Sequence, residues 1–247
     1  MAKKMHFAVI LLHCPMHHSV GSWRLSRSLV GYHYARPPFW QDVARILERG
    51  KFDMLFLADG IGVSDRYGRQ PNELKVLWGL MPIVGETEDA AKAKERALIE
   101  AVPPLGGITQ LSTHIGYDLS RVPLAATLEE FAAENGQGLL QMLSQGLGIQ
   151  GLAKMLMKEN MGKAVTVAEA AQFYGSGIGP KIVGTPTQVA TQLEDIFDEV
   201  GGDGFMLITH YLPGCLEEFV EMVVPILQQR GRFRKDYEGT MLREHLR

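Results

Sequence analysis

The chain has 247 residues, of which 46% are hydrophobic and 21% are charged, and its 25 Lys and Arg against 28 Asp and Glu give a net charge of −3. This composition excludes a disordered or collagen-like protein, and the charge indicates neither a nucleic-acid partner nor an anionic membrane. The two cysteines, Cys14 and Cys215, form no disulfide framework, and no apolar run is long enough to predict a membrane span, so we expect a cytoplasmic protein.

Near-continuous apolar runs predict buried strands of a parallel sheet that is covered on both faces. There are four such runs: Met5–Leu12, Phe52–Ala58, Lys75–Val84 and Gly204–Thr209. A helix is expected over Pro38–Arg49, with a proline in its first turn and Gly50 at its end. The order strand, helix, strand near the N-terminus is typical of an α/β fold, either a doubly wound sheet or a barrel.

The middle of the chain departs from this alternation. About 100 residues, Thr87 to Pro186, contain no run from which we predict a strand. Ser/Thr-x-x-Glu/Gln capping boxes there and just beyond predict the starts of helices. They begin at Thr127, Thr166 and Thr185. Four predicted strands are too few for a closed eight-stranded barrel.

Function in parallel α/β folds gathers at the carboxyl ends of the strands. Several chemically capable residues follow the predicted strands: His13, Cys14, His17 and His18 after the first, Asp59 after the second and His210 after the last. The histidine and cysteine cluster has three open interpretations, namely a metal site, a pocket that uses imidazole for hydrogen bonding or proton transfer, and a loop with no site. Asp59 could contact a ligand or cap the following loop. A basic run over 230–235 is expected to be a solvated surface.

Several stretches resemble bacterial-luciferase-like flavin monooxygenases, in the branch of the nitrilotriacetate, EDTA, dibenzothiophene-sulfone and long-chain alkane enzymes. They are 17–24 (HHSVGSWR), 44–60 (ARILERGKFDMLFLADG), 80–90 (LMPIVGETEDA), 183–186 (VGTP) and 202–207 (GDGFML). The resemblance covers most of both ends of the chain, and its most specific portion is the stretch that ends in Asp59-Gly60.

The resemblance implies a (β/α)8 barrel of the TIM type that binds reduced FMN from a separate flavin reductase and uses dioxygen to oxygenate a small organic substrate. The cofactor would carry the oxygen chemistry, through a flavin hydroperoxide, while the protein positions and shields it. By similarity, Asp59 would lie at the flavin, and Cys14, His17 and His114 would be catalytic residues that line the substrate pocket.

The chain is considerably shorter than members of this family, and the four missing strands are the middle ones. We therefore expect one luciferase-like α/β domain over 1–247, an incomplete barrel in which residues 1–68 form the N-terminal portion and residues 69–247 the C-terminal portion. Open apolar sheet edges favour a homo-oligomer. The alternative is an internally deleted, non-catalytic relative that acts as a scaffold or subunit, and a deazaflavin-dependent oxidoreductase is a more distant third.

Overall fold

The structure is a computed structural model, and it describes residues 4–11, 19, 21–26, 28, 33, 36–57, 76–115, 118–127, 130–131, 165–177 and 179–239. The chain divides into two compact units. The sheet unit comprises Met1–His18, Trp23–Ala97 and Gly179–Arg247, and the helical unit comprises Ser19–Ser22 and Leu98–Ile178.

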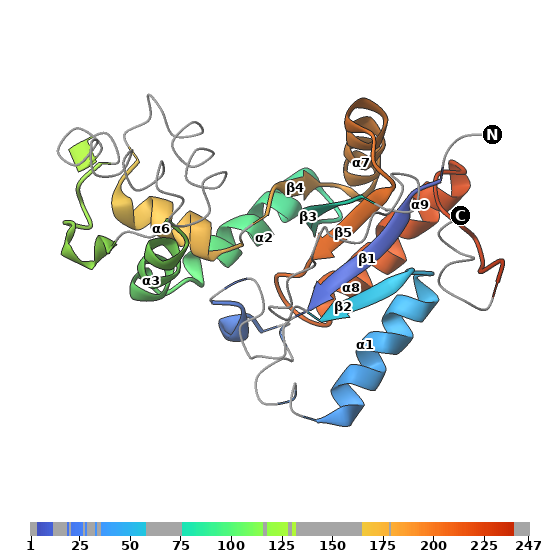
Figure 1. Cartoon of the computed structure of the whole chain (residues 1–247), viewed down its shortest axis with the longest axis horizontal. Coiled ribbons are helices and arrows are strands. Elements are labelled where there is room, and N and C mark those ends of the chain that lie inside the picture. Colours follow the sequence, from blue (N-terminus) through green and yellow to red (C-terminus); the bar gives the residue numbers. More distant parts are fainter. Residues whose placement is uncertain are drawn as a thin grey trace, which may run out of the picture. The chain divides into compact units, whose positions relative to one another are not determined.

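The sheet unit is built on five parallel strands in the order β2-β1-β5-β3-β4 (Figure 1). The strands are β1 (His6–Leu11), β2 (Met54–Leu57), β3 (Leu77–Val84), β4 (Lys181–Gly184) and β5 (Gly204–Ile208). The first and last of them pair directly, with His6 opposite Gly204 and Ile10 opposite Ile208. Neighbouring first and last strands are what a closed (β/α) barrel requires. Because every pairing is parallel, all the carboxyl ends lie at one edge, which we call the carboxyl edge, and the amino ends lie at the opposite amino edge.

The predicted parallel α/β fold and its four strands are confirmed, but the count of four is wrong because it omits β4. This strand lies inside the region for which the sequence predicted none, and it pairs with the second half of β3, from Met81 opposite Lys181 to Val84 opposite Gly184. β4 has only four residues, begins with a lysine and follows Pro180. So short a run, with a charged residue at its start, carries no periodicity by which it could be recognised.

Phenylalanine side chains form the core between the sheet and the elements that cover it. Phe7 of β1 is fully buried, and its ring lies 4.8 Å from that of Phe233, 5.3 Å from that of Phe219 and 5.7 Å from that of Phe52, measured between ring centroids. Tilted and edge-on aromatic pairs of this kind add to the stabilisation that burial provides. Phe219 and Phe233 come from the C-terminal region of the chain, so this cluster ties both ends of the sequence to β1.

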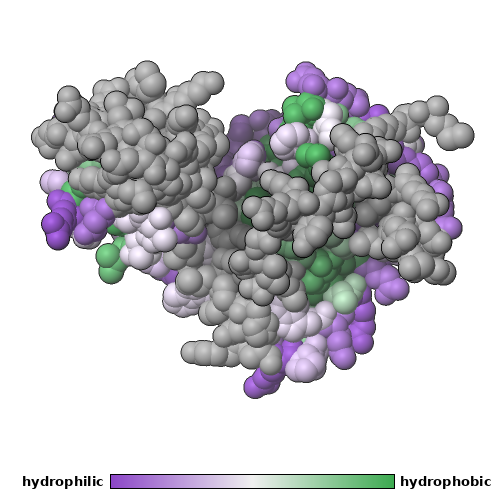
Figure 2. Space-filling model, in the orientation of Figure 1, coloured by the Kyte–Doolittle hydropathy of each residue, from purple (hydrophilic) through white to green (hydrophobic). Residues whose placement is uncertain are grey.

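Helix α1 (Pro37–Arg49) covers part of the sheet unit and confirms the helix predicted over Pro38–Arg49. Its prolines occupy the first turn, where their missing N–H groups cost nothing, and Phe39, Val43, Ile46 and Leu47 are buried. Figure 2 shows a hydrophilic outward surface on this helix beside hydrophobic residues at the sheet. The other elements of the unit are α2 (Glu88–Glu100), which continues into the helical unit, α7 (Pro186–Val200), α8 (Gly214–Glu218), the π-helix η6 (Phe219–Val223) and α9 (Val224–Gln229).

The helical unit contains α3 (Pro104–Ile115), η5 (Leu119–Arg121) and α6 (Val167–Gly175), with η1 (Ser22–Arg24) beginning at its edge. α3 and α6 pack closely because Gly107 has no side chain, since a Cβ there would lie 2.4 Å from the Ala171 carbonyl oxygen. The capping boxes predicted at Thr127 and Thr166 are both confirmed by reciprocal hydrogen bonds with Glu130 and Glu169.

The expectation that no segment spans a membrane can be examined on the helices of the described ranges. None of these helices combines the length and the apolar character needed to cross a bilayer.

Candidate functional site

Four residues are assigned to the site by resemblance: Cys14, His17, Asp59 and His114. Cys14, His17 and Asp59 lie outside the described residues, and so does the side chain of His114, whose backbone belongs to the last turn of α3. The structure does place the ends of β1 and β2, the strands that precede Cys14, His17 and Asp59. Leu11 and Leu57, the last residues of β1 and β2, are register partners at the carboxyl edge. The assignments of these four residues therefore stay predictions.

His210, the candidate at the end of the last strand, lies at the carboxyl edge as predicted. It follows β5 by two residues and is 1% exposed, as is the neighbouring Thr209. Within the portion of the chain that the structure describes, the two ring nitrogens of His210 have no hydrogen-bond partner. The hydroxyl of Thr209 has none there either. Buried polar groups are normally hydrogen-bonded, so three free polar atoms at this edge call for an explanation.

Both residues line a small cavity. Its volume is about 10 Å³, close to the space that one water molecule or one oxygen atom of a ligand requires. It is lined by Pro82, Leu207, Ile208, Thr209, His210, Cys215 and Leu216. Apart from the imidazole, the hydroxyl and the thiol, the side chains of this lining are apolar, so a polar group that entered would find its partners on His210 and Thr209.

Burial determines the protonation of both titratable groups in this lining. It lowers the pKa of His210 from 6.5 to about 3, and the positive charges of Lys94 and Lys181 act in the same direction. The imidazole is therefore neutral at physiological pH, with one nitrogen able to donate and the other able to accept. Burial also raises the pKa of the Cys215 thiol to about 12, which keeps it protonated and excludes it as a nucleophile at neutral pH.

An ion-pair network lies next to His210 and fixes the elements around it. Lys94 of α2 donates to the Val84 carbonyl oxygen at 2.6 Å, and its Nζ lies 2.8 Å from Oε1 of the buried Glu218. The Tyr211 hydroxyl donates to Oε2 of Glu218 at 2.7 Å, and the Tyr211 ring meets that of His210 edge-on at 4.8 Å. The network joins α2, the end of β3 and α8, and it orients the imidazole without hydrogen bonding to it.

A second and larger pocket opens beside this network. Its volume is about 240 Å³, and it is lined by Glu86, Lys94, Glu217, Glu218, Glu221 and Met222. Pockets that enclose a molecule of cofactor size usually measure about 300–1,000 Å³ and are mostly apolar. This pocket is smaller and acidic, so it does not suit a flavin that carries a phosphate. Among the described residues, no cluster of His, Cys, Asp and Glu could hold a metal ion.

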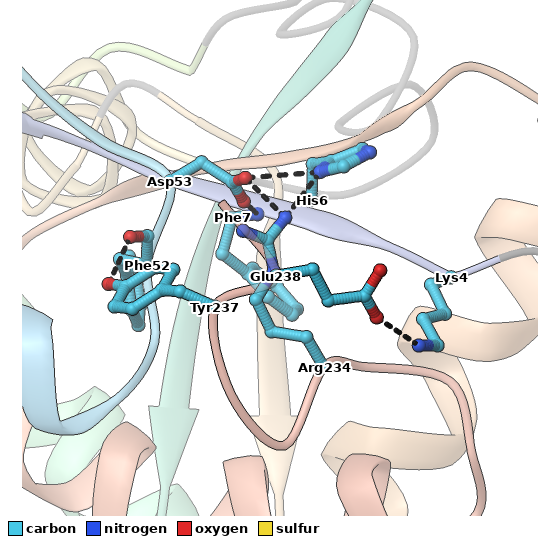
Figure 3. Close-up of polar contacts among 8 residues, drawn as sticks. All are labelled: Lys4, His6, Phe7, Phe52, Asp53, Arg234, Tyr237 and Glu238. Carbon is cyan, nitrogen blue, oxygen red and sulfur yellow. Dashed lines mark hydrogen bonds and ion pairs between the residues drawn. The ribbon is translucent and has the colours of Figure 1, made fainter. Parts of the chain in front are cut away.

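The amino edge of the same sheet holds a polar cluster that the sequence did not predict (Figure 3). The fully buried carboxylate of Asp53 accepts from the Phe7 N–H at 2.9 Å and from Nη2 of Arg234. The same Nη2 lies 2.8 Å from Nδ1 of His6, and the Tyr237 hydroxyl donates to the Phe52 carbonyl oxygen at 2.8 Å. This cluster holds residues 230–239 against β1 and the turn before β2.

The prediction that the basic run 230–235 is a solvated surface is accordingly wrong for two of its arginines. Arg234 is 7% exposed and pairs with Asp53. The side chain of Arg232 is 13% exposed and pairs with Asp198 of α7. Both partners lie far away in sequence, so the run itself contains no signal of burial.

Sequence comparison relates the chain to characterised monooxygenases, although no protein-family model matches it. It is 36% identical over 181 residues to N-acetyl-S-(2-succino)cysteine monooxygenase of Bacillus subtilis, 33% over 184 residues to dibenzothiophene-sulfone monooxygenase of Rhodococcus erythropolis, and 35% over 193 residues to nitrilotriacetate monooxygenase component A of Aminobacter aminovorans. These alignments cover 72%, 74% and 77% of this chain but 39%, 39% and 40% of the relatives, so the chain spans about two-fifths of their length.

Structure comparison supports the same relationship at the level of the fold. DmoA from Hyphomicrobium sulfonivorans superposes with a TM-score of 0.79 over 99% of this chain and 92% of that chain, at 16% identity. The long-chain alkane monooxygenase LadA superposes with a TM-score of 0.74 over 100% of this chain and 96% of that chain, at 18% identity. The superpositions show a shared fold. The sequence relatives show that the chain belongs to the luciferase-like monooxygenase family, alongside the nitrilotriacetate, dibenzothiophene-sulfone and long-chain alkane monooxygenases.

Proposed function

We propose that the protein oxygenates a small organic substrate with dioxygen and reduced FMN, and that a separate reductase supplies the reduced flavin. The observation that carries this proposal is the 36% identity over 181 residues to a named monooxygenase. The nitrilotriacetate relative is named as component A of its system, which supports the two-component arrangement. Bound FMN would supply the activation of oxygen, and the protein would bind, orient and shield the reactants.

In this proposal Asp59 contacts the flavin, and Cys14, His17 and His114 face the substrate. The sheet supports the first three assignments, because the segments that carry Cys14, His17 and Asp59 follow two strands that end side by side at the carboxyl edge. Strand ends at that edge are where (β/α) barrels position their reacting groups. β5, which carries His210 beyond its end, pairs with β1 on the other side.

The proposal is tested by analysing products of a reductase-coupled reaction that contains the purified chain, FMN, a flavin reductase, NADH, dioxygen and one candidate substrate. The candidates come from the names of the relatives: N-acetyl-S-(2-succino)cysteine, dibenzothiophene sulfone and nitrilotriacetate. We expect oxygenated product only when the chain is present, and we expect Asp59→Ala to require at least about tenfold more reduced FMN for the same rate, as when one charge-assisted contact is lost. Asp42→Ala is the matched control, since Asp42 is an exposed carboxylate of α1 paired with Arg45. Unchanged flavin dependence in Asp59→Ala would remove Asp59 from the site.

The alternative is a non-catalytic relative that acts as a scaffold or subunit. It is motivated by the alignment with the Bacillus subtilis relative, which covers 72% of this chain but 39% of that protein. A folded chain that neither binds reduced FMN nor forms product would support this alternative over the enzyme.

We further propose a cytoplasmic homo-oligomer with one luciferase-like domain over 1–247. β2 supports oligomer formation, because its Leu55 and Phe56 are 37% and 42% exposed on a strand whose one described neighbour is β1. Sedimentation velocity of the purified chain tests this point, with a dimer or larger species expected and a monomer contradicting it.

A further inference from the structure

The side-chain polar atoms of His210 and Thr209, just beyond the end of β5, indicate what kind of ligand the site binds. His210 and Thr209 are each 1% exposed, line one cavity, and together present two ring nitrogens and a hydroxyl without hydrogen-bond partners among the described residues. We propose that His210 and Thr209 form a hydrogen-bonding subsite for one oxygen atom of a small organic ligand, a carboxylate or carbonyl oxygen. The inference rests on the proposed function, in which this ligand is the substrate.

The donor groups of the two side chains are suited to bind an oxygen acceptor. A neutral imidazole donates through one nitrogen, and a threonine hydroxyl also donates, so the pair can direct two hydrogen bonds at one oxygen. A hydrocarbon or thioether group would leave these donors buried and unpaired, which disfavours such a ligand. The cavity of about 10 Å³ has room for one oxygen atom and not for a ring.

The charges around the cavity favour an electron-rich ligand over a cation. Lys94 and Lys181 both lower the pKa of His210, which shows that their positive charges reach the imidazole. Glu218 lies 2.8 Å from Lys94 and offsets part of this charge. These positive charges disfavour an ammonium group relative to carboxylate and carbonyl oxygens, of which we expect the carboxylate to bind more tightly.

The other polar side chains near the cavity are not available to bind the ligand oxygen. The Cys215 thiol is buried and stays protonated, while Glu218 is engaged by Lys94 and by the Tyr211 hydroxyl. In the cavity lining, the hydrogen-bonding side chains without partners are therefore those of His210 and Thr209.

The subsite is tested by ¹⁵N NMR of the full chain labelled at histidine, with three probes of similar size: sodium acetate, acetamide and dimethyl sulfide. His210→Gln assigns the two ring signals of His210. We expect acetate and acetamide to shift these signals saturably, with acetate binding several-fold more tightly, and we expect dimethyl sulfide to leave them in place. Thr209→Val should weaken acetate binding by about tenfold, as expected for one lost hydrogen bond.

Two results would overturn the subsite. One is the absence of any shift with both oxygen-bearing probes, which would leave the cavity to an internal water molecule. The other is an equal shift with dimethyl sulfide, which would show apolar filling without hydrogen bonding. The remaining histidine signals report that each variant keeps its fold.

The test separates this inference from the proposed function because it uses no flavin. If acetate shifts His210 while the chain shows no reductase-coupled oxygenation, the subsite stands and the monooxygenase proposal fails. If oxygenation occurs while no probe shifts the His210 signals, the monooxygenase proposal is supported and the subsite is wrong.

Discussion

The amino and carboxyl edges of the sheet both bury polar side chains, but these side chains differ in whether they have hydrogen-bond partners. At the amino edge, the buried carboxylate of Asp53 is bound by Arg234 and by the Phe7 N–H, and residues 230–239 close over it. At the carboxyl edge, His210 and Thr209 are equally buried, yet their side-chain polar atoms have no partners within the described ranges. In (β/α) folds the amino edge stabilises the protein and the carboxyl edge holds the reacting groups. The contrast lies in the groups themselves: the buried carboxylate of Asp53 is bound by other groups of the chain, whereas the buried imidazole of His210 and hydroxyl of Thr209 remain available to a ligand.

The largest expected effect comes from breaking the ion pair at the amino edge. Asp53→Ala leaves the guanidinium of Arg234 buried without its carboxylate, and the side chains of Arg234 and Asp53 are 8% and 0% exposed. Removing one partner of a buried pair costs about 3–5 kcal/mol, so we expect the free energy of unfolding to fall by that amount in urea titrations. Asp42→Ala, at an exposed carboxylate, should change it by less than about 0.5 kcal/mol. A loss below about 1 kcal/mol for Asp53→Ala would show that the amino edge is not held by this pair.

An intermediate effect is expected from pH at the carboxyl edge. The pKa of His210 is about 3 in the folded chain and near 6.5 in the unfolded chain. Between these values the unfolded chain binds a proton that the folded chain does not, so stability is lost as the pH falls below about 6.5. From about pH 6.5 to about pH 5 this amounts to about 2 kcal/mol.

The measurement for this prediction compares the wild-type chain with His210→Gln by urea unfolding at pH 7, 6 and 5. Groups other than His210 contribute equally to both proteins and cancel in the difference. The variant should lose less stability than the wild type across this range. Parallel losses in the two proteins would show that His210 is solvated or paired.

The smallest expected effects come from two conservative substitutions that should change the free energy of unfolding in opposite directions. Tyr237→Phe removes the hydroxyl that donates to the Phe52 carbonyl oxygen at the amino edge, and we expect it to cost about 1 kcal/mol. Thr209→Val removes a hydroxyl without a described partner from an apolar cavity, so we expect it to leave stability unchanged or raise it by up to about 1 kcal/mol. Thermal unfolding of both variants in ligand-free buffer measures the two changes in stability. Equal losses would contradict the contrast between the edges.

The elements of this fold that could be predicted are those that a local sequence pattern indicates. β1, β3 and β5 are near-continuous apolar runs, and the capping boxes at Thr166 and Thr185 mark helix starts through contacts three residues apart. β4 escaped prediction because it is a short strand with a lysine, stabilised by its pairing with β3.

The features that could not be predicted depend on contacts between distant residues. Arg234 belongs to a basic run that is typical of a solvated surface, and its partner Asp53 lies 181 positions away. His210 could be placed at the carboxyl edge from its position after a strand. Its burial and its lack of partners depend on the tertiary structure around it, where Pro82 of the distant strand β3 lines the same cavity, and no local pattern predicts this.

The most direct test of the account is a calorimetric titration of anaerobically reduced FMN into the purified wild-type chain. We predict saturable binding with a dissociation constant in the micromolar range or tighter, which corresponds to about −8 kcal/mol or better. Tyr237→Phe at the amino edge should bind reduced FMN with the same affinity as the wild type. The absence of detectable binding by a folded wild-type chain would contradict the account and leave the non-catalytic alternative.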